Sequence, residues 1–236
     1  AMQFKGSSHT GVRAIVFDLD DTLYPESEYV LSGYKAAASM LGDAAEAKLY
    51  TQWLWQRFTE GRSAGAFDVL NDTFNLHLSP GRIAELVKAY REHSPTISPF
   101  EGMVDLLVRL KGAGMKLGLL SDGYQPGQRL KLDALGVGGS FDTIIFTEDI
   151  GRSAWKPSPL GFRAVAHRLA TAHAQCVYVA DNPSKDFVAP NSLGWLTIRL
   201  IHPRQVHSNL PTAQGGEPQL VAHSPAELEA ALLHRR

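Results

Sequence analysis

Acidic side chains gather directly behind a short apolar run near the start of the chain. Residues 14–17 are Ala-Ile-Val-Phe, and Asp18, Asp20 and Asp21 follow at once. The run predicts a buried strand, in which residues two apart point to one side, so Asp18 and Asp20 begin on the same face. Two carboxylates that close repel each other unless a proton or a cation lies between them, and Mg²⁺ favours oxygen ligands. The alternative is a strand followed by an ordinary polar turn, where Asp is common.

Further candidate residues also stand at the ends of apolar, strand-like runs. Ser121, Thr147 and Asp181 each follow such a run. Parallel strands present their carboxyl ends at one edge of a sheet, so these side chains are expected to converge. Lys156 lies in a loop that two nearby prolines stiffen. Each residue alone is also explained as an N-cap, a turn residue or a solvated lysine, but their joint occurrence favours a site.

Two kinds of pattern divide the chain. Residues 25–95 carry apolar side chains at three- and four-residue spacings and predict a helical domain, whereas residues 12–24 and 96–236 alternate strands with helices. Alternation predicts a parallel sheet with right-handed crossovers. The expected fold class is α/β, a Rossmann-like core with a small α-helical cap inserted after the first strand. The expected strands are 14–17, 115–120, 143–146, 176–180, 195–200 and 220–221, and the expected helices include 26–41, 66–74, 103–110, 128–135, 159–170 and 185–193, with others opening at 43, 79 and 224.

Composition limits the classes of function. The 236 residues include 23 Lys and Arg against 24 Asp and Glu, which gives a net charge of -1, and no basic run is present. This balance argues against nucleic acid as a partner. The longest apolar runs fall short of the ~20 residues of a membrane helix, and the N-terminal residues lack a signal-peptide core. A single cysteine, Cys176, excludes an internal disulfide and is expected to be buried filler. A cytoplasmic enzyme, monomeric or homodimeric, fits these features.

Four motifs, in order along the chain, carry a resemblance to a known family. They are Phe17-Asp18-Leu19-Asp20-Asp21-Thr22-Leu23, Leu119-Leu120-Ser121-Asp122-Gly123, Lys156-Pro157-Ser158-Pro159 with Phe162, and Val179-Ala180-Asp181-Asn182-Pro183-Ser184-Lys185-Asp186-Phe187. From about residue 14 to about residue 200, the sequence resembles the haloacid dehalogenase-like (HAD) superfamily, in particular its phosphatases with an inserted helical cap. Ala180 stands where the family usually has Gly. Asp122 stands where it often has Asn, which puts an unexplained negative charge beside the expected phosphate site.

The resemblance implies a role for each matching residue. Asp18 would be the nucleophile that forms an aspartyl-phosphate, and Asp20 the general acid and then base. Asp186 would orient Lys156 or a metal-bound water, Thr22 would support the loop, and Asp21 would be solvated or loop-structural. The implied catalytic residues are Asp18, Asp20, Ser121 and Lys156, the substrate-binding residues Ser121, Asp122, Gly123 and Lys156, and the Mg²⁺ ligands Asp18, Asp181 and the backbone carbonyl of Asp20.

The implied function is a Mg²⁺-dependent phosphatase of a small phosphorylated metabolite, such as a sugar phosphate or a nucleoside monophosphate. Dehalogenases of the superfamily attack carbon without a metal and lack the second acid of the first motif, so Asp20 with Asp181 favours phosphoryl transfer. A phosphomutase with the same core, and a non-catalytic binding protein that retains the fold, remain alternatives. The cap would select the substrate. Its candidate side chains are Ser32, Arg57, Arg62 and Asn71, and Tyr24 could gate the site.

Overall fold

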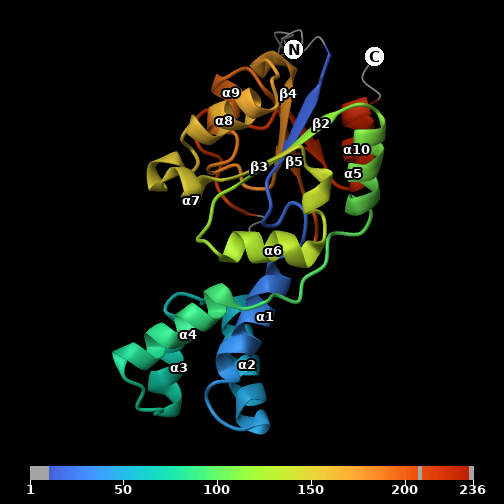
Figure 1. Cartoon of the computed structure of the whole chain (residues 1–236). Coiled ribbons are helices and arrows are strands. Elements are labelled where there is room, and N and C mark those ends of the chain that lie inside the picture. The colour runs from blue at the N-terminus through green and yellow to red at the C-terminus, as the bar shows by residue number, and fades with distance from the viewer. Residues whose placement is uncertain (1–10, 207–208, 234–236) are drawn as a thin grey trace. The chain divides into compact units, whose positions relative to one another are not determined.

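The computed structural model describes residues 11–206 and 209–233 (Figure 1). The chain divides into two compact units. Of the described residues, the sheet unit comprises 11–25, 99–123 and those from 136 onward, and the helical unit comprises Glu26–Ser98 and Tyr124–Leu135. Within the described residues, no helix combines the length and the apolar character needed to cross a bilayer.

The sheet unit is built on six parallel strands. They are β1 (Ala14–Phe17), β2 (Lys116–Ser121), β3 (Thr143–Phe146), β4 (Cys176–Ala180), β5 (Leu196–Leu200) and β6 (Leu220–Ala222). Their order in the sheet is β3-β2-β1-β4-β5-β6, so β1 lies in the middle between β2 and β4. Residues of β1, β2 and β4 are almost all buried, as expected for strands covered on both faces. The predicted Rossmann-like α/β fold is confirmed.

The register of the strands brings their carboxyl ends level. Phe17, the last residue of β1, lies opposite Leu119 of β2 and Val179 of β4. The Asp18 N–H then donates to the Val179 carbonyl at 2.9 Å, which extends the ladder by one residue. The residues that follow β1, β2 and β4 therefore leave the sheet at the same edge, as in other parallel sheets.

Helices cover both faces of this sheet, with α5 and α10 on one side and α8 and α9 on the other (Figure 1). Their bounds are α5 Met103–Gly112, α7 Thr147–Ile150, α8 Leu160–Arg168, α9 Val188–Ser192 and α10 Pro225–Leu233. Gly118 lets α8 approach β2 closely, because a Cβ there would lie 3.0 Å from Val165 Cγ2. The core between them contains the edge-on rings of Phe162, Tyr178 and Trp195.

The helical unit contains α1 (Glu26–Ala38), α2 (Ala44–Thr59), α3 (Ala66–Phe74), α4 (Pro80–Glu92) and α6 (Gly127–Leu135). Its core is formed by buried aliphatic and aromatic side chains of the first four helices. Asp43 caps α2 by accepting from Glu46 N–H at 2.9 Å, and Ser79 caps α4 by accepting from Arg82 N–H at 3.1 Å. Such N-caps satisfy backbone donors that the helix leaves without partners.

The segment around α6 belongs by its contacts to the helical unit, although the sequence division placed it in the core domain. The Arg91 guanidinium lies over the Tyr124 ring at 4.4 Å, and the Lys131 ammonium lies over the Tyr29 ring at 4.1 Å. The division into a core of residues 12–24 and 96–236 and a cap of residues 25–95 stays a proposal. We amend it by adding Tyr124–Leu135 to the helical unit.

One helix begins later than the sequence pattern predicted. The expected start of α9 was residue 185, but α9 begins at Val188. Residues 182–186 form a tight loop instead, in which the Asp186 Oδ2 atom accepts from Asn182 N–H at 2.9 Å and Asp186 N–H donates to the Asn182 carbonyl at 2.9 Å. The side chain of Asp186 competes here with helical hydrogen bonds, a usual effect of Asp near a helix start.

Candidate active site

Asp18 and Lys156 form a buried ion pair at the carboxyl edge of the sheet. Asp18 follows β1 directly, and Lys156 lies in the loop before α8. The Lys156 Nζ atom lies 3.1 Å from Asp18 Oδ1, and the two side chains are 1% and 8% exposed. Burial makes this attraction stronger than it would be in water. Two of the expected catalytic residues are therefore in direct contact.

The Lys156 ammonium has two further partners. Its Nζ atom donates to the Tyr178 hydroxyl at 2.7 Å and lies 3.0 Å from Asp186 Oδ1. The Tyr178 hydroxyl in turn donates to the Leu120 carbonyl at 3.1 Å. The expected contact between Asp186 and Lys156 is present, whereas Tyr178 was not anticipated. A hydroxyl-bearing side chain in an otherwise aliphatic buried strand was the available signal, because a buried phenol needs a hydrogen-bond partner.

Three carboxylates form an acidic cluster at this edge. Oxygen atoms of Asp18, Asp181 and Asp186 all lie within 4.8 Å of one another, and all three residues are buried. The buried Asp186 Oδ1 atom makes no hydrogen bond. It lies 3.0 Å from Lys156 Nζ, so this contact is an ion pair only. The carboxylates of Asp18, Asp186 and Asp122 all act electrostatically on the ammonium groups of both Lys156 and Lys185. The donor set and this charge balance fit a divalent cation with oxygen ligands.

Burial shifts the protonation equilibria of the central pair. Burial raises the pKa of Asp18 to about 7, with Asp186 and Asp20 adding to the shift and Lys156 opposing it. Burial alone would lower the pKa of Lys156, but Asp18 and Asp186 outweigh it and the pKa lies well above its ordinary value. Lys156 therefore stays a cation, and further positive charge near Asp18 would favour its ionised form.

Asp20 has a hydrogen-bond partner outside the acidic cluster. The Tyr24 hydroxyl donates to Asp20 Oδ1. Asp20 is half-buried and keeps access to solvent, which suits a residue that exchanges protons. Tyr24 is fully buried in the sheet unit, so it orients Asp20 rather than acting as an exposed gate. The spacing of Asp18 and Asp20 had suggested a cation shared by both side chains, but the Asp20 carboxylate has a hydrogen bond of its own with Tyr24.

The next two residues support the loop after β1. Asp21 is fully buried, which excludes the solvated alternative. It adopts a φ of 55°, and its Oδ2 atom accepts from Val206 N–H at 2.8 Å, so it is loop-structural. Thr22 Oγ1 donates to Asp181 Oδ1 at 3.4 Å and thereby links this loop to the one after β4.

The residues after β2 lie at the same edge. Ser121 is fully buried, and its hydroxyl donates to the Asp122 carbonyl at 3.1 Å. Gly123 has a φ of 131°, a conformation that residues with a side chain rarely adopt. The Asp122 carboxylate is buried and accepts from Thr147 Oγ1 at 2.7 Å.

The expected substrate-selecting residues of the helical unit have structural partners there. The hydroxyl of Ser32 accepts from Thr96 N–H at 2.9 Å, and Asn71 Oδ1 accepts from Leu78 N–H at 2.9 Å. Arg62 pairs with Glu60, and the Arg57 guanidinium lies over the Trp53 ring at 5.1 Å. The Arg57 Nε atom is buried and makes no hydrogen bond, whereas Ser32, Asn71 and Arg62 each have a polar partner.

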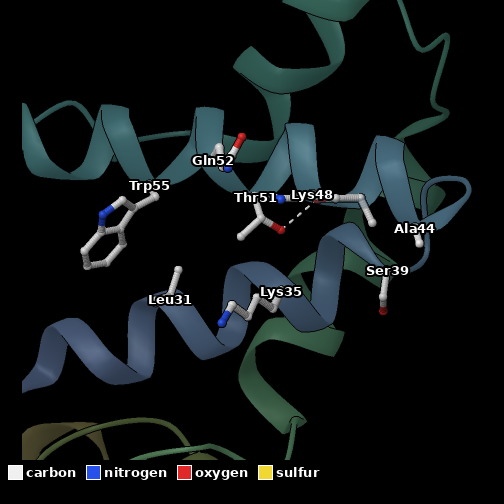
Figure 2. Close-up of a pocket in the computed structure, with 9 residues that line it drawn as sticks. Leu31, Lys35, Ser39, Ala44, Lys48, Thr51, Gln52 and Trp55 are labelled. Atoms are coloured by element: carbon white, nitrogen blue, oxygen red, sulfur yellow. Dashed lines mark hydrogen bonds between the residues drawn. The ribbon is translucent and has the colours of Figure 1, made fainter.

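Neither a groove in the helical unit nor the single cysteine offers a competing site. The groove, of about 520 Å³, lies between α1 and α2, where Leu31 points toward Trp55 across the gap (Figure 2). The polar residues that line it are Lys35, Ser39, Lys48, Thr51 and Gln52, and they include no histidine or carboxylate that could act as a base for a nucleophile. Cys176 is buried as expected, and burial raises the pKa of its thiol to about 12, so it is inert at neutral pH.

Comparison with known proteins places this site in a family. Residues 15–199 match the haloacid dehalogenase-like hydrolases. The chain is 29% identical over 197 residues to a glyceraldehyde 3-phosphate phosphatase of Methanopyrus kandleri, covering 80% of this chain and 84% of the relative. It is 30% identical over 198 residues to the protein of that name from Methanocaldococcus jannaschii, covering 80% and 85%.

A solved structure shows the same fold. The structure of a putative beta-phosphoglucomutase from Thermotoga maritima aligns with a TM-score of 0.68 at 20% identity, covering 94% of this chain and 99% of that one. At this identity the likeness concerns the fold alone. The matched family spans all four motifs, and the curated relatives are named as phosphatases. The chain belongs to the haloacid dehalogenase-like hydrolases, and within them it is a phosphatase.

Proposed function

We propose that this phosphatase hydrolyses the phosphate monoester of a small metabolite through an aspartyl-phosphate on Asp18, with Mg²⁺ as cofactor. The observation that carries the proposal is the buried contact of Asp18 with Lys156 at 3.1 Å, beside the carboxylates of Asp181 and Asp186. A carboxylate that attacks an anionic phosphate meets electrostatic repulsion, so the nucleophile needs cations next to it.

In the first half-reaction, an Asp18 carboxylate oxygen forms a bond to phosphorus while the bond from phosphorus to the ester oxygen breaks. Asp20 gives its proton to the departing alkoxide, so the alcohol leaves as a neutral molecule. The Lys156 ammonium stabilises the negative charge between nucleophile and phosphate, and Ser121 with nearby backbone N–H groups binds the transferring oxygens.

In the second half-reaction, Asp20 takes a proton from a water molecule whose oxygen attacks the phosphorus of the aspartyl-phosphate. The bond between phosphorus and the Asp18 oxygen breaks, which releases inorganic phosphate and restores the carboxylate. The hydrogen bond from Tyr24 holds the Asp20 side chain in one orientation during both steps.

A divalent cation completes the charge balance of the proposal. When bound, Mg²⁺ would offset the negative charge of the carboxylate and the phosphate as they meet. Asp18 and Asp181 would hold it through carboxylate oxygens, with the backbone carbonyl of Asp20. Asp186 belongs to the same cluster of oxygens and is added as a candidate ligand.

The substrate is proposed at the level of a class. We infer a small phosphorylated metabolite, either a sugar phosphate or a nucleoside monophosphate. Two relatives whose alignments cover 80% of this chain are named glyceraldehyde 3-phosphate phosphatases. Glyceraldehyde 3-phosphate is therefore the first compound to test.

The test is phosphate release from a panel of phosphorylated metabolites, with and without Mg²⁺. We expect Mg²⁺-dependent release by the wild-type chain and none by Asp18→Asn, which keeps the size of the side chain but removes the nucleophilic charge. Trapping of a labelled aspartyl-phosphate on the wild-type chain tests the intermediate. Absence of release from the whole panel in the presence of Mg²⁺ contradicts the proposed function, and transfer of phosphate within a sugar phosphate, without release, would indicate a mutase.

A further inference from the structure

The carboxylate of Asp122 faces protein donors from three separate segments of the chain. Asp122 is 7% exposed. Thr147 Oγ1 donates to its Oδ1 atom at 2.7 Å. The Lys156 N–H lies 3.2 Å from Oδ1 and 3.1 Å from Oδ2, and the Lys185 ammonium lies 3.4 Å from Oδ2. A buried carboxylate with such partners has its hydrogen-bonding capacity well satisfied by the protein.

The contact with the Lys156 amide anchors that residue at its backbone end. Lysine is a long side chain with four carbons in its stem, so the position of its ammonium depends on where the backbone lies. The Lys156 ammonium is held by Asp18, Tyr178 and Asp186 at the other end. Asp122 and these three residues therefore fix both ends of one side chain.

Lys185 differs from Lys156 in its surroundings. It lies in the loop between Asp181 and Asp186, and its side chain is 39% exposed, against 1% for Lys156. A lysine side chain is ordinarily a cation at neutral pH, and the Lys185 ammonium lies 3.4 Å from Asp122 Oδ2. An ammonium carries three donors, and Asp122 accepts from one of them.

We propose that Asp122 is a positioning residue that holds both the Lys156 backbone and the Lys185 ammonium, and that Lys185 contacts a non-bridging oxygen of the substrate phosphate. This inference rests on the proposed function, because it presumes a phosphate bound beside Asp18. It also gives a reason for a negative charge at position 122: a carboxylate can accept from the Lys156 amide and pair with Lys185 at the same time.

The variant Asp122→Asn separates the contact with the Lys156 amide from the pairing with the Lys185 ammonium. Its single side-chain oxygen can still accept from Thr147 and the Lys156 amide, but its NH₂ group cannot pair with an ammonium. Asp122→Asn is therefore expected to act like Lys185→Gln, whereas Asp122→Ala removes the backbone anchor as well. A matched control exists at the opposite end of β2, where Asp142 Oδ2 accepts from Leu117 N–H at 2.8 Å and Oδ1 lies 3.6 Å from the Lys111 ammonium.

The experiment measures kcat and KM for phosphate release from p-nitrophenyl phosphate. We expect Lys185→Gln and Asp122→Asn each to lower kcat/KM about 10-fold to 100-fold, mainly through KM, as for the loss of a charge-assisted hydrogen bond. The double variant should lose no more than either single one, because both remove the same contact. Asp122→Ala should lower kcat as well, on the order of 10²-fold, because Lys156 is misplaced. Asp142→Asn, Lys111→Gln and their double variant should retain wild-type kinetics.

A second measurement does not depend on catalysis. Hydrogen exchange of the Lys156 amide should be slow in the wild-type chain and in Asp122→Asn, and faster in Asp122→Ala. The proposal is overturned if the fold-losses in kcat/KM of Lys185→Gln and Asp122→Asn multiply in the double variant. It is also overturned if the Lys156 amide of Asp122→Ala exchanges as slowly as in the wild-type chain. If the wild-type chain releases no phosphate from any substrate, the proposed function fails, and with it the role of Lys185. The exchange data then still decide whether Asp122 anchors Lys156.

Discussion

At the residue scale, Lys156 connects groups that lie far apart in the chain. Its ammonium meets Asp18, 138 residues earlier, and Tyr178, 22 residues later. Each of these contacts is buried, so the loss of one partner leaves a largely buried polar group without that hydrogen bond. The site is thus sensitive to changes that remove a single oxygen atom.

Tyr178→Phe removes one such atom without changing the shape of the ring. The Lys156 ammonium would lose an acceptor and the Leu120 carbonyl would lose a donor. We expect the free energy of unfolding to fall by about 1–3 kcal/mol and kcat to fall about tenfold, because the ammonium can shift away from Asp18. Thermal unfolding and steady-state kinetics measure the two effects.

Tyr34→Phe is the control, because Tyr34 is 4% exposed but lies in the core of the helical unit. It should leave kcat at the wild-type value. A wild-type kcat in Tyr178→Phe would contradict the role assigned to this hydroxyl.

At the element scale, strand ends and short loops bring the functional groups together. Asp18 follows β1, Ser121 ends β2 and Asp181 follows β4, and these three strands are neighbours in the sheet. The loop 182–186 turns tightly before α9, which brings the Asp186 carboxylate back beside Asp18 and Asp181. Had the helix begun at residue 185, Asp186 would lie in its first turn instead of in this loop.

Close helix contacts in the other unit make a separate prediction. A Cβ on Gly33 of α1 would lie 2.5 Å from Tyr90 Cδ2 of α4. The Tyr90 ring is itself packed against Tyr34 and Phe67 at centroid distances of 5.7 and 6.2 Å. We expect Gly33→Ala to lower the free energy of unfolding by about 1–3 kcal/mol through overpacking, which outweighs a gain of up to about 1 kcal/mol in helix propensity.

Gly112→Ala in α5 is the comparison, because an added Cβ there meets nothing within 4 Å. This variant should be neutral or more stable than the wild-type chain. Urea unfolding measures both variants, and a stabilising effect of Gly33→Ala would show that α1 and α4 are not in close contact.

At the scale of the whole molecule, charge is concentrated at one edge although the net charge is only -1. Asp18, Asp181 and Asp186 are buried within reach of one another, and their mutual repulsion acts against the folded state. A cation that binds the folded chain and not the unfolded one should relieve this repulsion and raise stability.

Mg²⁺ is therefore expected to raise the Tm in a concentration-dependent way, by an amount equivalent to about 2.7 kcal/mol at a hundred times its Kd. Chelation with EDTA should reverse the rise. Asp181→Asn should lose most of the shift, whereas Asp142→Asn, a change in the same unit away from the cluster, should keep it. A Tm that does not respond to Mg²⁺ would count against a metal site here.

The sequence by itself determined the positions of the strands and the residues at their ends. Apolar runs of four to six residues in alternation with helical periodicity predicted a parallel sheet, and such a sheet places its carboxyl ends at one edge. This was enough to bring Asp18, Ser121, Lys156 and Asp181 to one site, and the order of four motifs was enough to indicate the family.

Only the tertiary structure decided which side chains meet at that edge. Tyr178 accepts a hydrogen bond from Lys156, and Tyr24 donates one to Asp20. Asp186 lies in the acidic cluster with Asp18 and Asp181, and Asp122 pairs with Lys185. The contacts of Lys156, Asp186 and Asp122 join segments that are distant in sequence and depend on strand register and loop conformation. Tyr24 and Asp20 are only four residues apart, but a tight turn sets their contact. Local patterns of hydrophobicity do not encode these pairings, because each is fixed by how buried polar groups satisfy one another in the folded chain.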